Sequence, residues 1–210
     1  MQIAVIVVGF AVEVVAWRLV ASGRFSVWTL MTGVFAALAV ASVAVRPPVA
    51  ASDVTAGTAA AAGLGAGLVL YLATRVFVAV AARWEPFRAQ VLDRYDAARE
   101  IPLWAALAIG LLIAVPGEEL FWRGLAQPRL QESMPVLSGA ALAWLGYVLA
   151  NAASGSLPFA AAAVVGGAVW AGLAVWTGGV LASIACHMVW TGLMVARPPM
   201  AGRQPVEVVT

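Results

Sequence analysis

The chain has 210 residues, of which 63% are hydrophobic and only 10% are charged, and its mean hydropathy is +0.96. Soluble globular domains carry about a quarter charged residues, so this composition excludes that class and predicts an integral membrane protein. The net charge of +2 is too small to indicate a nucleic-acid partner, and the single cysteine, Cys186, excludes an internal disulfide.

Seven apolar segments approach or exceed the length of about 20 residues that a transmembrane helix needs. They are residues 2–21, 27–45, 57–82, 103–126, 135–152, 158–176 and 179–196. Short stretches rich in glycine, proline, serine and aspartate separate most of them. We therefore predict an all-α fold, a bundle of about seven transmembrane helices, in a multi-pass protein that has the lipid bilayer as a partner.

The longest polar connection covers residues 83–100, where four arginines and four acidic residues alternate with apolar side chains at helical spacing. This pattern predicts either an amphipathic helix lying at the membrane interface or a solvated connector. Residues 1–100 then comprise the N-terminal transmembrane helices and this amphipathic connector. Residues 197–210 begin with two prolines after the first arginine and are expected to form a flexible tail.

Some ionisable side chains fall well inside the predicted spans, where burial in lipid is costly and a functional role is the default hypothesis. They are Glu13, Arg18, Arg75, Glu118, Glu119, Arg123 and His187. The first three have no further polar company in their own helices, so pairing or snorkelling to the interface is the expectation for them.

The segment "AVPGEELFWRGLAQ", residues 114–127, is different because its polar residues cluster. Glu119 and Arg123 are four positions apart in the favourable order on a helix, which predicts an ion pair. Glu118 is turned by about 100° from Glu119 and has no partner within the helix. A carboxylate in that position can serve as a general base or acid.

Two other spans carry polar pairs at the same spacing, Tyr147 with Asn151 and His187 with Thr191. Together with Glu118 they suit activation of a water molecule, with His187 and Asn151 donating to a developing oxyanion. The set also suits a proton relay in a transporter. A zinc site is harder to build because the chain has one histidine, so the metal and any cofactor are left unassigned.

The expected depths raise one conflict. At 1.5 Å per helical residue, Glu118 and His187 lie about 8 Å and about 12 Å from the same face of the bilayer core. Asn151 comes out at about 24 Å from that face. Either its helix starts later, or the helix kinks, or Asn151 does not belong to the site.

The motifs "EELFWRG", "GAVWAGL" and "WTGGVLASIACHMVWTGL" resemble the CAAX protease and bacteriocin-processing (CPBP, or Abi) family of intramembrane endopeptidases. The resemblance covers about residues 100–196 and implies a CAAX-protease-like catalytic core over 101–196. It implies hydrolysis of a peptide bond at the bacterial cell membrane, in a peptide or protein substrate with or without a lipid anchor.

Position by position, the resemblance implies that Glu118 activates water, that Glu119 completes the glutamate pair and that Arg123 is structural. Tyr147 matches the aromatic position, and His187 matches the histidine of the last motif. The remaining two positions depart from the family pattern.

Asn151 stands where most members have a histidine, and Thr191 stands where asparagine or aspartate is usual. Asn151 can still donate a hydrogen bond but cannot take up a proton. The alternative function is therefore a catalytically inactive relative that acts as a membrane binding or immunity protein.

Overall fold

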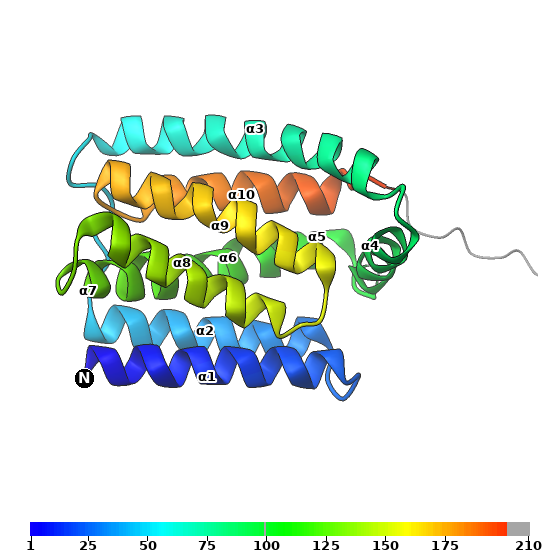
Figure 1. Cartoon of the computed structure of the whole chain (residues 1–210), viewed down its shortest axis with the longest axis horizontal. Coiled ribbons are helices and arrows are strands. Elements are labelled where there is room, and N and C mark those ends of the chain that lie inside the picture. The colour runs from blue at the N-terminus through cyan, green and yellow to red at the C-terminus, as the bar shows by residue number, and fades with distance from the viewer. Residues whose placement is uncertain (99, 201–210) are drawn as a thin grey trace, which may run out of the picture.

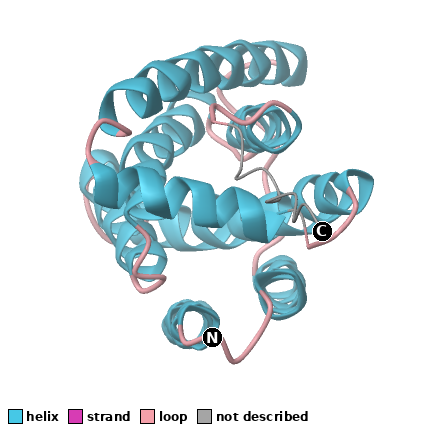
Figure 2. Cartoon of the chain, turned by 90° about the vertical axis from the view of Figure 1, so that its right-hand side faces the viewer, coloured by secondary structure: helices cyan, strands magenta, loops and turns pink. Residues whose placement is uncertain are grey.

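The computed structural model describes residues 1–98 and 100–200, and within them every regular element is a helix. Most helices run side by side along the long axis of the molecule, and α4 lies across one end (Figure 1). Seen from that end, α1 and α2 lie end-on at the bottom of the bundle (Figure 2). The chain is an all-α integral membrane protein, as its composition predicts.

The helices on the N-terminal side are α1 (Gln2–Ala21), α2 (Val27–Val45), α3 (Ala56–Ala81) and α4 (Glu85–Ala98). A long helix from Leu103 to Gln131 follows, made of α5 (Leu103–Ile109), η1 (Gly110–Ala114), α6 (Val115–Glu119), η2 (Leu120–Ala126) and α7 (Gln127–Gln131). The last three are α8 (Val136–Ala152), α9 (Leu157–Thr177) and α10 (Leu181–Ala196).

All seven predicted spans are helical, and six of them agree with the observed bounds to within two residues. Within the described residues, five helices are long and apolar enough to cross a membrane: α1, α2, α3, the 103–131 helix and α9. Helices α8 and α10 are apolar but shorter, with 17 and 16 residues.

The fourth predicted span is too short, because the helix continues to Gln131 rather than ending near residue 126. The prediction ends there because the following stretch, 127–135, contains proline and serine residues that mark turns. The structure has π-helical winding just before Pro128 and also just before Pro116. Such wider turns accommodate an interruption in the backbone hydrogen bonds of a helix, and they are frequent at functional sites.

Close contact between α3 and α10 depends on two glycines of α3. A Cβ at Gly63 would lie 2.4 Å from the carbonyl oxygen of Ala182, and one at Gly67 would lie 2.6 Å from that of Cys186. Glycine at both positions lets the two backbones approach closely, as expected for small residues in membrane helices. This contact holds α10, which carries His187, against the bundle.

The connection 83–100 contains a helix, α4, so the helical alternative for this segment is correct over Glu85–Ala98. Phe87 and Val91 are buried against Val78 of α3, and the Phe77 ring meets the Phe87 ring edge-on at 5.6 Å. The apolar face of α4 therefore packs on the end of the bundle. The predicted tail begins at Arg197, and its residues 201–210 lie outside the described residues.

Candidate functional site

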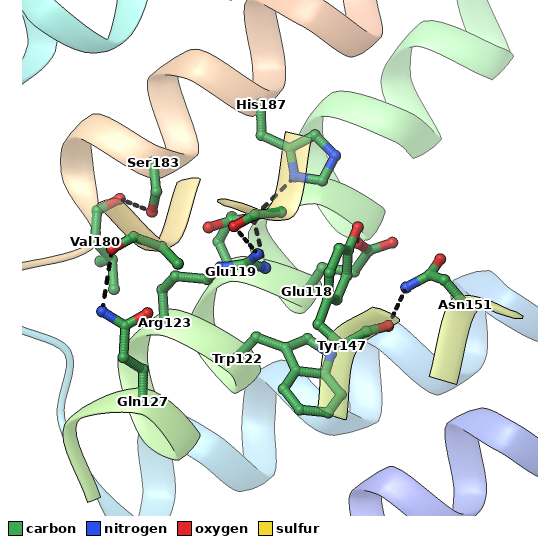
Figure 3. A network of polar contacts seen from close by, with 12 residues as sticks. Glu118, Glu119, Trp122, Arg123, Gln127, Tyr147, Asn151, Val180, Ser183 and His187 are labelled. Atoms are coloured by element: carbon green, nitrogen blue, oxygen red, sulfur yellow. Dashed lines mark hydrogen bonds and ion pairs between the residues drawn. The ribbon is translucent and has the colours of Figure 1, made fainter. Parts of the chain in front are cut away.

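The polar side chains of the bundle interior meet around the 103–131 helix, which contributes Glu118, Glu119 and Arg123 (Figure 3). Helix α8 contributes Tyr147, and α10 contributes His187. Three segments that are distant in sequence thus supply one cluster.

Glu119 is the centre of this cluster and is fully buried. Its Oε1 lies 3.3 Å from Nη1 of Arg123, which confirms the ion pair that the spacing predicts. The same oxygen lies 2.9 Å from Nδ1 of His187. The sequence predicts that His187 acts together with Glu118, whereas the direct hydrogen-bond partner of His187 is Glu119.

Arg123 is enclosed by groups that suit a buried guanidinium. Its Nη2 donates to the carbonyl oxygen of Gly167 at 3.1 Å. The guanidinium carbon lies 4.4 Å from the centre of the Tyr147 ring and 5.5 Å from that of Trp170. Cation–π contacts of this kind stabilise a desolvated cation. Arg123 therefore ties the 103–131 helix to both α8 and α9.

Glu118 accepts a hydrogen bond from the Tyr147 hydroxyl at 2.9 Å. It has the partner that its own helix cannot supply, and that partner comes from α8. Unlike Glu119, Glu118 is only partly buried. The more accessible of the two carboxylates therefore faces Tyr147, and the enclosed one contacts Arg123 and His187.

The His187 ring is held from two sides. Trp170 stacks on it with ring centres 3.6 Å apart and planes 15° apart, and Glu119 holds Nδ1. An ionised carboxylate only accepts, so the proton of this hydrogen bond resides on Nδ1. Nε2 then carries a lone pair in the neutral imidazole and a proton only in the imidazolium form.

Residues 100–193 match the family model described as type II CAAX prenyl endopeptidase Rce1-like. These residues belong to the Rce1-like family. No curated protein and no solved structure matches the chain. The matched residues run from just before α5 into α10 and contain Glu118, Glu119 and His187.

The Rce1-like region also contains Asn151 and Thr191. Their connection to the cluster is less direct than that of Tyr147 and His187. Asn151 is buried, and its Nδ2 donates to the backbone carbonyl of Tyr147 at 3.1 Å. Its helix starts at Val136, one residue from the predicted start, so a late start is not the explanation. The 103–131 helix instead ends later than predicted, which places Glu118 about 20 Å from that helix end and removes most of the conflict in depth. Thr191 lies one helical turn beyond His187 on α10 and lines a cavity.

That cavity lies beside the Rce1-like site and has a volume of about 500 Å³. Its lining is apolar and comes mainly from α3, α4, α9 and α10, including Phe77, Tyr95, Phe159 and Trp190. Arg94 lies at the cavity and places its guanidinium 5.8 Å from the centre of the Phe159 ring. The cavity thus extends from the connector helix to the turn next to His187.

Three residues in or near the cluster are not assigned a site role from the sequence. Trp170 stacks on His187, Gln127 donates to the carbonyl of Ala171 at 3.3 Å, and Glu13 accepts from Trp122 at 3.0 Å. For Glu13 the signal was available, since a carboxylate inside an apolar span needs a partner. For Trp170 the sequence gives no such signal, because tryptophan is common throughout the chain.

Among the described residues, no three His, Cys, Asp or Glu side chains lie together as a metal-binding group. Glu119 Oε1 is already engaged by two nitrogen donors, Arg123 and His187. This donor set does not fit a divalent ion.

Proposed function

We propose that this protein is an intramembrane endopeptidase that hydrolyses a peptide bond of a membrane-held substrate. The observation that carries the proposal is that one polar cluster inside an Rce1-like region contains both a partly accessible carboxylate, Glu118, and an imidazole, His187, that Glu119 holds in place. The multi-pass arrangement in a bacterial cell membrane is part of the same proposal.

Glu118 acts as the general base in this proposal. It takes a proton from a water molecule while the water oxygen forms a bond to the scissile carbonyl carbon, and the carbonyl oxygen becomes an oxyanion. His187, in its imidazolium form, donates from Nε2 to that oxyanion. The proton held by Glu118 then passes to the leaving nitrogen as the C–N bond breaks, which restores the carboxylate.

The neighbouring residues have supporting roles. Glu119 and Arg123 fix His187, since Glu119 contacts both. Tyr147 orients Glu118 through its hydroxyl. Asn151 is proposed as an oxyanion donor by family position, but its hydrogen bond to the Tyr147 carbonyl favours a second role, holding the end of α8 that presents Tyr147. Thr191 is proposed to contact the substrate from the cavity.

The apolar lining of the cavity supports one class of substrate. An apolar cavity of about 500 Å³ beside Thr191 supports a substrate with an apolar segment, either a hydrophobic peptide or a lipid anchor. We propose a peptide or protein substrate of this kind.

The test uses purified protein in detergent and an internally quenched farnesylated peptide that ends in a CAAX motif, together with its unprenylated counterpart. Glu118→Gln should abolish hydrolysis while the melting temperature stays close to that of wild type. Glu85→Gln is the matched control, because Glu85 is an exposed carboxylate on α4 that pairs with Arg88. Equal activity of Glu118→Gln and wild type would refute the proposed role of Glu118. Absence of hydrolysis by wild type would favour the inactive relative.

A further inference from the structure

Glu13 is a carboxylate of α1 that lies outside the residues matched by the family model. It is fully buried, and its Oε2 accepts a hydrogen bond from Nε1 of Trp122 at 3.0 Å. Trp122 follows the Glu118–Glu119 pair on the 103–131 helix. A carboxylate from the N-terminal part of the chain thus contacts the segment that carries the candidate site.

Trp122 in turn contacts the residue that holds Glu118. Its ring meets the Tyr147 ring edge-on, with centres 5.9 Å apart and planes at 74°. The Tyr147 hydroxyl donates to Glu118 at 2.9 Å. A continuous series of contacts therefore runs from Glu13 through Trp122 and Tyr147 to Glu118.

Trp122 is held both by packing and by its hydrogen bond to Glu13. Phe10 of α1 meets the indole edge-on at 6.4 Å, and Gly146 of α8 leaves room for it, since a Cβ there would lie 3.0 Å from Cζ3 of Trp122. These apolar contacts define a slot between α1 and α8. The hydrogen bond to Glu13 is the directional contact that fixes the indole within the slot.

We propose that Glu13 is a positioning residue of the hydrolytic site, which orients Tyr147 and Glu118 through Trp122. The inference rests on the proposed function and extends the site to helix α1. Leaving the Trp122 N–H without an acceptor inside the bundle is unfavourable, so the indole would turn and the Tyr147 ring would shift with it. Glu13 itself contacts neither the substrate nor the reacting atoms in this proposed role.

The first measurement does not depend on activity. The chain has three tyrosines, Tyr71, Tyr95 and Tyr147, so isotope-labelled tyrosine gives an NMR spectrum that tyrosine-to-phenylalanine variants can assign. Glu13→Leu should shift the Tyr147 signal and leave that of Tyr71 in place. Glu13→Gln keeps an acceptor for Trp122 and should restore the wild-type signal. An unchanged Tyr147 signal in Glu13→Leu would overturn the proposal.

The second measurement is hydrolysis of the farnesylated CAAX peptide. A small misplacement of a reacting group can cost up to about 10²-fold, so Glu13→Leu should lower kcat about tenfold with KM unchanged. Glu13→Gln should recover most of that loss. Trp122→Phe breaks the same hydrogen bond from the other side, and the double variant should be no worse than the poorer single variant.

Ser42→Ala is the control, because Ser42 is a buried polar residue of the adjacent helix α2 and has no place in this series of contacts. It should leave the Tyr147 signal and kcat unchanged. If wild type hydrolyses the peptide and Glu13→Leu does so with the same kcat, the proposal is wrong. If wild type hydrolyses nothing, the proposed function fails and the tyrosine spectrum alone decides whether Glu13 positions Tyr147.

Discussion

His187 Nδ1 and Glu119 Oε1 are 2.9 Å apart, and Arg123 Nη1 reaches the same oxygen at 3.3 Å. One carboxylate oxygen therefore serves a cation of its own helix and an imidazole from α10. This shared contact gives the two adjacent glutamates different surroundings. Glu119 is enclosed by the two nitrogen donors, and Glu118 is left facing Tyr147 and the more accessible side.

Glu119→Gln should destabilise the protein strongly. The substitution leaves the Arg123 guanidinium buried without its counter-charge, and breaking a buried pair in this way costs about 3–5 kcal/mol. We expect a lower melting temperature in detergent and a lower yield of folded protein. Glu85→Gln, which removes an exposed ion pair with Arg88, should change neither. A Glu119→Gln variant as stable as Glu85→Gln would show that the buried pair does not hold the bundle together.

Tyr147→Phe should impair hydrolysis without unfolding the protein. Phenylalanine keeps the ring beside Arg123 and Trp122 but removes the hydroxyl that donates to Glu118. A hydrogen bond to a charged group contributes about 1.5–3 kcal/mol, so kcat should fall about tenfold or more. Tyr71→Phe is the control because the Tyr71 hydroxyl donates to the Arg197 carbonyl instead. Equal losses in both variants would argue against a specific role for Tyr147.

Gly67→Ala should weaken the contact between α3 and α10. The new Cβ would lie 2.6 Å from the Cys186 carbonyl oxygen and 2.8 Å from Cβ of Val189, so α10 must move. Overpacking of this kind costs about 1–3 kcal/mol, and hydrolysis should fall too because His187 follows Cys186.

Gly65→Ala provides the matched control on the same helix. A Cβ at Gly65 would meet nothing within 4 Å, and alanine is favoured over glycine in a helix by about 1 kcal/mol. Thermal melting of both variants should therefore give a lower melting temperature for Gly67→Ala and an equal or higher one for Gly65→Ala. The reverse order would contradict the packing account.

The ion pair of Glu132 with Arg46 at the surface should make the stability of the protein depend on pH. The hydrogen bond from Arg46 holds the pKa of Glu132 below its ordinary value. A carboxyl group whose pKa is lowered in the folded state stabilises the fold above the unfolded-state pKa, and that contribution is lost as the pH falls through the folded-state pKa.

Melting of wild type and Glu132→Gln should therefore differ at neutral pH and converge in acid, below about pH 4. The difference should be small because both side chains are partly exposed, and it should shrink in high salt. A difference that grows as the pH falls would contradict the lowered pKa.

The helical architecture and the ion pair of the site could both be predicted from the amino-acid sequence. Apolar runs of about 20 residues leave a membrane chain little choice but to form helices, because lipid offers no partner for backbone groups. The four-residue spacing of Glu119 and Arg123 is a local relation, which the helix converts directly into contact.

Which groups face each other across helices could not be predicted and became visible in the three-dimensional structure. The rotation and depth of α1, α8 and α10 relative to the 103–131 helix assign His187 to Glu119, Tyr147 to Glu118 and Glu13 to Trp122. Spacing along one helix carries no information about these relations, since they depend on how whole helix surfaces pack. The continuation past Pro128 was also hidden, because π-helical turns depend on what surrounds the helix.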